Sequence, residues 1–549
     1  MATKLLSGSL YSSLIYGGAA NLKANAEIVN ELNVFPIPDG DTGENMSMTI
    51  AGGVKQAKTV TSEDLSMVSD TIATGMLLSA RGNSGVILSQ FFAGIAKGFT
   101  GQETADVKTV GYALKSGVRR AYESVMKPTE GTMLTVAREG VDYGVDRITG
   151  ESTLESFFSD VLDEMNRSLQ RTPELLAVLK EAGVIDSGGA GLVYIIDGMK
   201  KTLLGEEINE SDVVTSVKSV DTSAFTADSI MEFGYCTEFL LQLQNSKVDA
   251  ENFDIAKITD YLNTVGDSIV AFKTGTIVKI HVHTMTPGAV LEFCRQFGEF
   301  LTVKIENMTL QHNDSIAEGT REAKKAEPKK RFATIAVAEG EGIKQTFADL
   351  GADYVINGGQ GKNPSSEDFI EAFDEVNAET IFVLPNNGNI IMAAQLAGSM
   401  YEKSKIYVIP SKSVGDGYAA LSMLSYDSGD EEEIVNDMTS SMEGVVTGRV
   451  TKSIRDASID DVCIHVDDYI GFSGKSMLSS EKMKVDAAAK MLEKLNAKNY
   501  EVMIVIYGAT ASEEDRNAFR IFVKNAYPKT ELYEIDGGQD VYDFEIILE

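Results

Sequence analysis

The stretch Pro38-Asp39-Gly40-Asp41-Thr42-Gly43-Glu44-Asn45-Met46 places two carboxylates two residues apart, with a glycine between them. Its proline, glycine and aspartate content is typical of a loop rather than of a helix or a central strand. Such a loop can direct both carboxylates into one small volume, and Mg²⁺ prefers carboxylate ligands together with phosphate oxygens. A bare Asp-Gly-Asp tripeptide is also a common surface turn. The wider sequence context favours a divalent-cation site at Asp39 and Asp41.

A helix is predicted directly after this loop. Met46, Ile50 and Val54 recur at helical spacing, and Thr42 is a candidate N-cap. Backbone N–H groups face outward at a helix start, where the helix dipole favours an anion. The same few residues are therefore expected to bind a metal and a phosphate group. The missing third oxygen ligand and the missing closing glutamate exclude an EF-hand.

Three other turns place small residues directly before a predicted helix. They are Gly82–Gly85, Gly131–Thr132 and Asp186–Gly191. Small residues let the backbone approach an anion closely. One such turn is ordinary helix capping, whereas several indicate helix ends that converge on one polyanion. The chain has no Walker A pattern, which excludes a P-loop enzyme.

Composition bounds the partners and the compartment. The 549 residues carry a net charge of −33, which disfavours nucleic acid and anionic membrane surfaces as partners. Three cysteines form no disulfide framework and suit a reducing cytoplasm, and Cys294 and Cys463 are expected to be buried packing residues. The first 20 residues match a signal peptide poorly. No apolar run approaches the ~20 residues of a membrane-spanning helix.

The hydrophobic periodicity divides the chain into parts of different style. Residues 1–205 carry helix-period apolar residues throughout and predict an all-helical domain. Residues 206–229 are polar and predict a linker. Residues 230–317 mix strand and helix patterns, as a small α+β domain does. Residues 318–330 form a charged linker, and residues 331–549 alternate strands and helices, which predicts an α/β domain.

Two histidines stand close together in the middle domain. Tyr235–Leu243 and Thr276–His283 are predicted strands, and positions i and i+2 of a strand share a face. His281 and His283 therefore project together, and Cys236 on a neighbouring strand would complete a three-ligand zinc set with an open position. The alternative is a paired polar face beside an unrelated core cysteine.

Three turns of the C-terminal domain follow predicted strands: Asn357–Gly361, Pro385–Gly388 and Pro410–Ser413. Turns at the carboxyl ends of parallel strands are where open α/β sheets bind ligands. Ordinary loops between strands and helices would look the same, so both interpretations stay open here.

Several of these motifs occur together in a known family. The segments Asn33–Met46, Arg81–Gln90, Gly131–Leu134, Asp186–Leu192 and His281–His283 resemble, in this order, the ATP-binding subunit of bacterial fatty acid kinase. More distantly, the N-terminal part is similar to the nucleotide-binding subunit of dihydroxyacetone kinases. The C-terminal region looks like the two-lobed fold of DegV-type fatty-acid-binding proteins. The resemblance covers nearly the whole chain and implies an eight-helix barrel for the N-terminal domain.

The resemblance also implies site residues. Asp39 and Asp41 would bind Mg²⁺, with the neutral Asn33 as third ligand where dihydroxyacetone kinases have an aspartate. Catalytic roles are implied for Asp39 and Asp41, and for His281, His283 and Cys236 with or without Zn²⁺. Nucleotide contacts are implied for Thr42, Gly43, Asn45, Asn83, Ser84, Thr132, Asp186, Ser187 and Gly188.

The resulting hypothesis is a magnesium-dependent kinase that transfers the γ-phosphoryl group of ATP to a fatty acid, giving an acyl phosphate for phospholipid synthesis. A fatty acid is ionised at pH 7, so no general base is needed, and Arg81 or Arg138 is a candidate for stabilising the transferred group. The resemblance implies a separate fatty-acid-binding subunit of the DegV family. Residues 1–205 are expected to bind ATP by themselves, and a homodimer is left open. The alternatives are a dihydroxyacetone-type small-molecule kinase and a non-catalytic nucleotide-sensing regulator.

Overall fold

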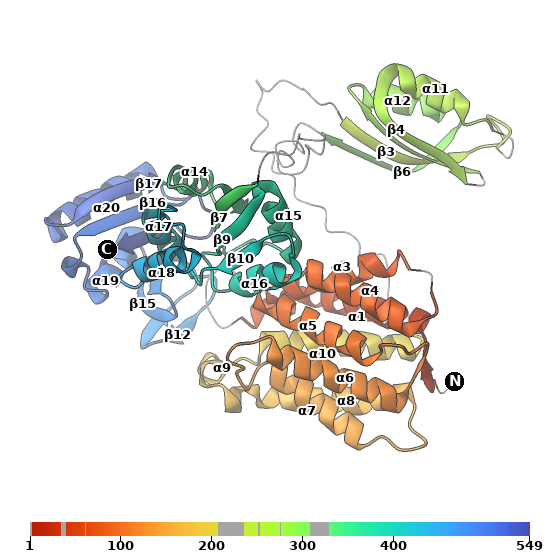
Figure 1. Ribbon diagram of the computed structural model, residues 1–549, viewed down its shortest axis with the longest axis horizontal. Helices are drawn as coiled ribbons and strands as arrows, with labels where there is room; N and C mark the ends of the chain where they lie inside the picture. Colours follow the sequence, from red (N-terminus) through yellow and green to blue (C-terminus); the bar gives the residue numbers. More distant parts are fainter. Residues whose placement is uncertain are drawn as a thin grey trace. The chain divides into compact units, whose positions relative to one another are not determined.

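The computed structural model describes residues 3–33, 40–60, 62–206, 235–250, 253–274, 276–307 and 329–549. The chain divides into two compact units. One unit comprises Met1–Thr215 together with Lys329–Glu549, and the other comprises Ser216–Pro328. The first unit therefore joins an N-terminal helical region to a C-terminal α/β region, which are far apart in sequence (Figure 1).

The helical region begins with a short antiparallel pair, β1 (Leu5–Leu6) and β2 (Ala105–Asp106). Side chains at several helix starts accept a backbone hydrogen bond, as Asp64 does from Met67 at 2.9 Å. The helices are α1 (Gly8–Ala24), α2 (Ala26–Glu31), α3 (Thr42–Ala57), α4 (Leu65–Leu78), α5 (Gly82–Gly98), α6 (Val107–Glu123), α7 (Met133–Asp146), α8 (Leu154–Leu175), α9 (Ala177–Ala182) and α10 (Ser187–Leu203).

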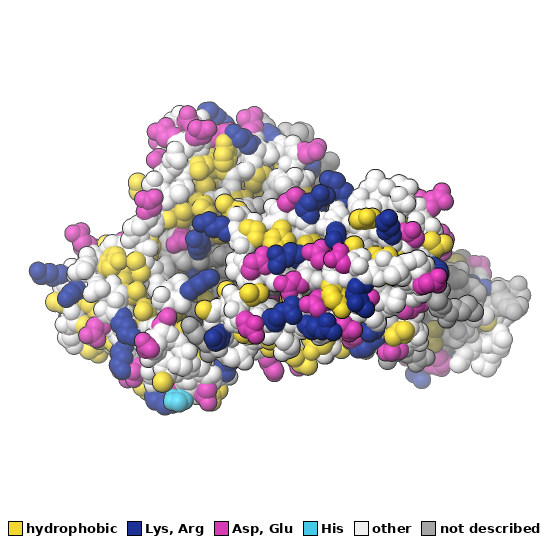
Figure 2. Space-filling view, turned by 90° about the horizontal axis from the view of Figure 1, so that it is seen from below, with side chains coloured by type: hydrophobic (Ala, Val, Ile, Leu, Met, Phe, Trp, Pro, Cys, Tyr) yellow, Lys and Arg dark blue, Asp and Glu magenta, His cyan; other side chains and the backbone are white. Residues whose placement is uncertain are grey.

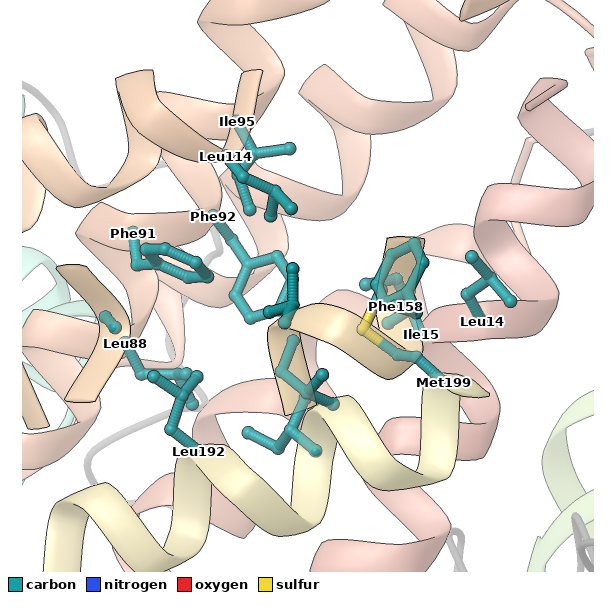
Figure 3. Close-up of a cluster of buried hydrophobic side chains, with 14 of the residues drawn as sticks. Leu14, Ile15, Leu88, Phe91, Phe92, Ile95, Leu114, Phe158, Leu192 and Met199 are labelled. Carbon is teal, nitrogen blue, oxygen red and sulfur yellow. The ribbon is translucent and has the colours of Figure 1, made fainter. Parts of the chain in front are cut away.

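One hydrophobic core holds these helices together. Figure 3 shows Phe91 and Phe92 of α5 among side chains from α1, α6, α8 and α10. Small residues let the helices approach closely: a Cβ atom on Gly94 of α5 would lie 2.6 Å from the Cα atom of Gly117 in α6. Because the helices pack this closely, their starts can be held in fixed positions relative to one another.

The C-terminal region contains a four-stranded parallel sheet in the order β10-β9-β7-β8. Its elements alternate strand and helix, as the sequence predicted. They are β7 (Lys330–Ala338), α14 (Glu341–Asp349), β8 (Tyr354–Asn357), α15 (Ser366–Val376), β9 (Ala378–Leu384), α16 (Ile391–Met400), β10 (Lys405–Val408), α17 (Val414–Ser422) and α18 (Glu431–Ser441).

A second, mixed sheet follows in the order β15-β14-β11-β18-β16-β17, and β12 pairs with β13 beside it. The central strand β18 is buried along its whole length. The elements are β11 (Val446–Lys452), β12 (Ala457–Ile459), β13 (Val462–Ile464), β14 (Tyr469–Ser473), β15 (Ser476–Glu481), α19 (Lys484–Lys494), η2 (Ala497–Asn499), β16 (Val502–Tyr507), α20 (Glu513–Ala526), β17 (Glu531–Asp536) and β18 (Phe544–Leu548).

The second unit contains an antiparallel sheet in the order β4-β5-β3-β6. Phe239, Leu241, Val278, Ile280 and Val282 are buried on one face of it, in one core with residues of two helices. The elements are β3 (Tyr235–Leu243), α11 (Ala256–Val265), β4 (Gly266–Thr274), β5 (Ile277–Thr284), α12 (Pro287–Arg295) and β6 (Gly298–Asn307).

The predicted multidomain organisation, with a helical N-terminal domain and an α/β C-terminal region, is confirmed. The eight-helix barrel and the domain boundaries stay predictions. Cys294 is buried as expected, but Cys463 is exposed, so the prediction of a buried Cys463 was wrong. It lies in the short edge strand β13, which is not covered on both faces.

The part of the chain that the structure describes contains no helix long and apolar enough to cross a membrane. On the face drawn in Figure 2, acidic and basic side chains are interspersed. The strong negative charge of the whole chain is therefore not gathered into one acidic patch on that face.

Candidate functional site

The predicted helix after the Asp-Gly-Asp loop is α3, and Asp41 is its N-cap residue. The backbone N–H of Gly43 donates a 2.7 Å hydrogen bond to Asn30 Oδ1. A Cβ atom on Gly43 would lie 2.3 Å from the carbonyl oxygen of Ala26, so only glycine fits there. Asp39 lies outside the described residues. The structure therefore gives a position for Asp41 but none for its predicted partner.

The starts of α3 and α10 lie together. Ser187 is the first residue of α10, and its hydroxyl donates a 3.4 Å hydrogen bond to the hydroxyl of Thr42, the first residue of α3. Gly188 is buried directly behind Ser187. Two of the predicted small-residue turns thus meet at one place, as the sequence indicated.

The start of α7 adjoins the same place. Thr132 is the N-cap residue of α7, and its hydroxyl donates to the carbonyl oxygen of Thr129 at 2.7 Å. A Cβ atom on Gly188 would lie 3.4 Å from the Cβ atom of Met133, the first residue of α7. The α7 and α10 starts are therefore neighbours.

The start of α5 is the fourth member of this group. Gly82 has a φ angle of +57°, and a Cβ atom there would lie 2.8 Å from Asn45 Nδ2 on α3. Asn45 is 5% exposed, and Asn83 and Ser84 are half-buried in the first turn of α5. The starts of α3, α5, α7 and α10 therefore converge, and we name them the four-helix junction.

Asp186 is a carboxylate at this junction with an altered pKa. Burial raises the pKa of Asp186 from 3.8 to about 6, and hydrogen bonds from the Gly189 and Met133 backbone act in the opposite direction. The carboxylate accepts the Gly189 N–H at 2.6 Å as N-cap of α10. A carboxyl that is close to half-protonated near neutral pH is a common feature of binding and catalytic sites.

The two arginines considered for transition-state stabilisation have other partners. Arg138 pairs with Glu130 at 3.0 Å, and Arg81 lies 3.4 Å from Asp368 of the α/β region. Arg81 also donates a 2.7 Å hydrogen bond to the carbonyl oxygen of Asn363. Neither guanidinium therefore faces the four-helix junction without a competing partner.

Residues of the α/β region reach the metal loop, and sequence reasoning missed them. Asn363 Nδ2 donates a hydrogen bond to Asp41 Oδ2, and Asn83 Nδ2 donates to Asn389 Oδ1 at 3.2 Å. Asn363 and Asn389 closely follow two of the strand-end turns singled out in the sequence. The turns were the available signal, but nothing local indicated that they would contact residues about 300 positions earlier.

The described residues alone contain no cluster of three or more His, Cys, Asp or Glu side chains that could hold a metal ion. The donors near Asp41 nevertheless suit a hard cation. The Oδ1 atoms of Asn83 and Asn363 are buried and have no hydrogen-bond partner within the described ranges. Amide and carboxylate oxygens are ligands of Mg²⁺, so these residues, with Asp39, fit the implied ion.

In the middle unit, the strand register brings the second predicted group together at the backbone level. Cys236 on β3 pairs with His283 on β5, and Glu238 pairs with His281. Because neighbours directly opposite in an antiparallel pair share a face, positions 236, 281 and 283 belong to one face of the sheet. The register therefore agrees with the proximity that a zinc set would need.

The strand-end turns of the α/β region also line a small cavity of about 30 Å³. Asn386, Arg449, Gln539 and Glu545 are among the lining residues, and Arg449 forms a buried 2.8 Å ion pair with Glu545. This volume admits water but not an acyl chain. The cavity gives no support to lipid binding within this region.

Family models match three successive parts of the chain. Residues 36–201 match the DAK2 domain, residues 232–315 match the FakA-like middle domain, and residues 333–549 match the FakA-like C-terminal domain, both of the latter described as parts of a fatty acid kinase. The first match defines a kinase-related class of protein. With the other two, the chain belongs to the FakA-like family of fatty acid kinase proteins.

Full-length relatives agree with this assignment. The chain is 37% identical to protein YloV of Bacillus subtilis (strain 168) over 558 residues, which covers 100% of both chains. It is 34% identical to an uncharacterized protein of Staphylococcus aureus (strain USA300) over 554 residues, which covers 99% of each. The family therefore rests on the whole chain rather than on one domain.

Solved structures give weaker likenesses. DegV, a fatty acid binding protein from Bacillus subtilis, is 12% identical with a TM-score of 0.31 over 40% of this chain and 100% of that one. The dihydroxyacetone kinase of C. freundii is 19% identical with a TM-score of 0.28 over 35% of this chain and 34% of that one. At such TM-scores these likenesses support no conclusion about this chain.

Proposed function

We propose that this chain is the ATP-binding catalytic component of a two-component fatty acid kinase. It would transfer the γ-phosphoryl group of ATP to the carboxylate of a fatty acid that a separate fatty-acid-binding protein presents. The product would be an acyl phosphate for phospholipid synthesis in the cytoplasm. The observation that carries this proposal is the four-helix junction beside Asp41 in a member of the FakA-like family.

The junction supplies what a phosphoryl transfer needs from the protein. The helix starts direct backbone N–H groups and the positive ends of helix dipoles toward a polyphosphate. The acceptor carboxylate is already ionised at pH 7, so its oxygen attacks the γ-phosphorus without a base, and the bond to the β–γ bridging oxygen breaks as ADP leaves. Positioning and charge neutralisation are then sufficient for the reaction.

Asp39 and Asp41 would hold Mg²⁺, with Asn33 as a neutral third ligand. The bound ion would neutralise charge on the β- and γ-phosphates. Thr42, Gly43 and Asn45 of α3 would contact the phosphates together with Asn83 and Ser84 of α5. Thr132 and the Asp186–Gly188 turn would complete the nucleotide contacts.

The middle unit is proposed to contribute Cys236, His281 and His283. Two imidazoles and a thiolate are a donor set that Zn²⁺ accepts, with one position left open. A thiol and two imidazoles on one sheet face can also contact a transferred phosphoryl group. Metal analysis of the purified chain distinguishes these roles, because only the first predicts stoichiometric zinc.

A separate acceptor protein is proposed because the long apolar tail of a fatty acid needs a dry tunnel. The α/β region offers only the small polar cavity described above. We propose that this region instead docks the partner, which would be a fatty-acid-binding protein of the DegV family.

The test measures ADP release and traps acyl phosphate as its hydroxamate. The full chain is incubated with ATP, Mg²⁺ and a fatty acid, with and without a fatty-acid-binding protein of the DegV family. We expect acyl phosphate only when both proteins are present. Rapid phosphorylation of dihydroxyacetone would favour the small-molecule kinase instead. ATP binding without turnover on any acceptor would favour the nucleotide-sensing regulator.

A further inference from the structure

The α/β region touches the metal loop through one asparagine. Asn363 Nδ2 donates a hydrogen bond to Asp41 Oδ2, across 322 residues of sequence. Asn363 is 3% exposed, so this contact is closed off from solvent. An amide that holds one carboxylate oxygen fixes the direction in which the other oxygen faces.

A set of polar contacts holds Asn363 in place. Arg81 donates a 2.7 Å hydrogen bond to the carbonyl oxygen of Asn363 and lies 3.4 Å from the Asp368 carboxylate. The Ser366 N–H donates to the Ala80 carbonyl oxygen at 3.2 Å. We name these contacts, with the Asn363–Asp41 hydrogen bond, the interdomain seam. They join the start of α5 to the loop between β8 and α15.

The second strand-end loop reinforces the seam. Asn389 accepts from Asn83 Nδ2 at 3.2 Å, and Asn387 Nδ2 donates to Gln360 Oε1 at 3.0 Å. The loops after β8 and β9 are thus tied to each other as well as to α5. The position of Asn363 therefore depends on the fold of the α/β region and not on a single loose turn.

Buried oxygens at the seam point to a ligand. The Oδ1 atoms of Asn363 and Asn83 are buried without a hydrogen-bond partner in the described part of the chain. A Cβ atom on Gly82 would lie 2.8 Å from Asn45 Nδ2 and 3.5 Å from Asn363 Nδ2, so the two amides face the same glycine. Buried polar atoms normally have partners, and a cation or its bound water supplies one for an oxygen.

We propose that Asn363 is a positioning residue for Asp41, and that metal binding by the helical region therefore depends on the α/β region. This inference rests on the proposed function, since it takes Asp41 as a ligand of the divalent cation. Residues that hydrogen-bond a metal ligand orient it, and their loss typically lowers metal affinity ~10–100-fold. The expectation that residues 1–205 bind ATP with Mg²⁺ unaided changes accordingly: without Asn363 that binding is weak.

The test uses the full chain, with Mn²⁺ alone as probe followed by electron paramagnetic resonance, and metal-free ADP followed by calorimetry. Asn363→Ala should weaken Mn²⁺ binding about tenfold or more. Its affinity for metal-free ADP should stay near that of the parent chain. Asn436→Ala, on an exposed position of α18 in the same region, is the matched control and should change neither.

Two comparisons separate the outcomes. Asp41→Asn is measured in the same assay, and unchanged Mn²⁺ binding there would overturn the proposed function itself. If Asp41→Asn abolishes Mn²⁺ binding while Asn363→Ala equals or exceeds the parent chain, the positioning role alone is overturned. An equal loss of Mn²⁺ and metal-free ADP affinity in Asn363→Ala would also overturn it, because that result indicates general damage to the site. Thermal unfolding of each variant verifies that it is folded.

Discussion

The Asp186 carboxylate accepts a 2.6 Å hydrogen bond from the backbone N–H of Gly189, and it does so where burial disfavours its charge. Its pKa in the folded chain is about 6 instead of 3.8. Because the folded state binds this proton more tightly than the unfolded state, the contribution to stability is fully present below pH 3.8. It is lost as the pH rises through about 6.

Asp186→Asn should therefore stabilise the fold at pH 7.5. The neutral amide avoids the buried charge and is itself a good N-cap. The pKa difference corresponds to at most ~3 kcal/mol, and partial exposure of Asp186 reduces this to about 1–2 kcal/mol. Thermal unfolding between pH 4.5 and 7.5 should show the gain shrinking as the pH falls. Asp64→Asn, at the N-cap of α4, is the control, and an equal gain at all pH values would contradict the prediction.

Asp39→Asn and Asp41→Asn should each lower phosphoryl transfer by at least ~100-fold, because each removes a charge that neutralises the cation. The unfolding midpoint should change little, since neither position belongs to a hydrophobic core. Turnover is measured as ADP release with the fatty-acid-binding partner present. Asp70→Asn, on an exposed position of α4, should retain full turnover. Near-normal rates in both loop variants would rule out the metal assignment.

Gly82→Ala should impair both folding and nucleotide binding. The residue has a φ angle of +57°, where a side chain costs about 1–2 kcal/mol, and its Cβ atom would press on Asn45. We expect a lower unfolding midpoint and weaker ADP binding by calorimetry. Gly150→Ala meets no atom within 4 Å and is the matched control. Wild-type ADP affinity in Gly82→Ala would argue against nucleotide contacts at the start of α5.

His281→Ala and His283→Ala should depress turnover at least ~10-fold while leaving ATP affinity within a few fold. Both residues are remote in sequence from the four-helix junction, and the zinc content of each variant shows whether they bind metal. His465→Ala, an exposed histidine of the α/β region, should leave turnover and zinc content unchanged. Full turnover in the double variant His281→Ala/His283→Ala would assign the pair a merely structural role.

Local patterns predicted much of the helical region. Met46, Ile50 and Val54 are all buried on α3, as their spacing indicated. The helix α1 was not predicted, because its serines and glycines interrupt the apolar pattern, yet its small residues are what lets it pack closely on α10. Periodicity reports which face of a helix is apolar, but it does not report close backbone packing.

The candidate site was predictable only on one side. Each helix start at the junction has small or capping residues next to it in sequence, so a local signal existed. Asn363 has no such signal, since its role depends on a contact with Asp41 that only the folded chain creates. Cys463 shows the same limit, because its exposure depends on which strands cover β13.

The α/β region also holds the chain just before the metal loop. Arg455 donates to the carbonyl oxygen of Glu31 at 3.0 Å and to that of Asn33, while Asn363 holds Asp41 after it. A few polar contacts of this kind bind weakly between separate molecules. Their joining in one chain gives them an effective concentration of up to ~mM, which falls as the connecting segment lengthens. Two halves of this protein produced separately would therefore reassemble this site poorly at cellular concentrations, which gives a physical reason for both regions to share one polypeptide.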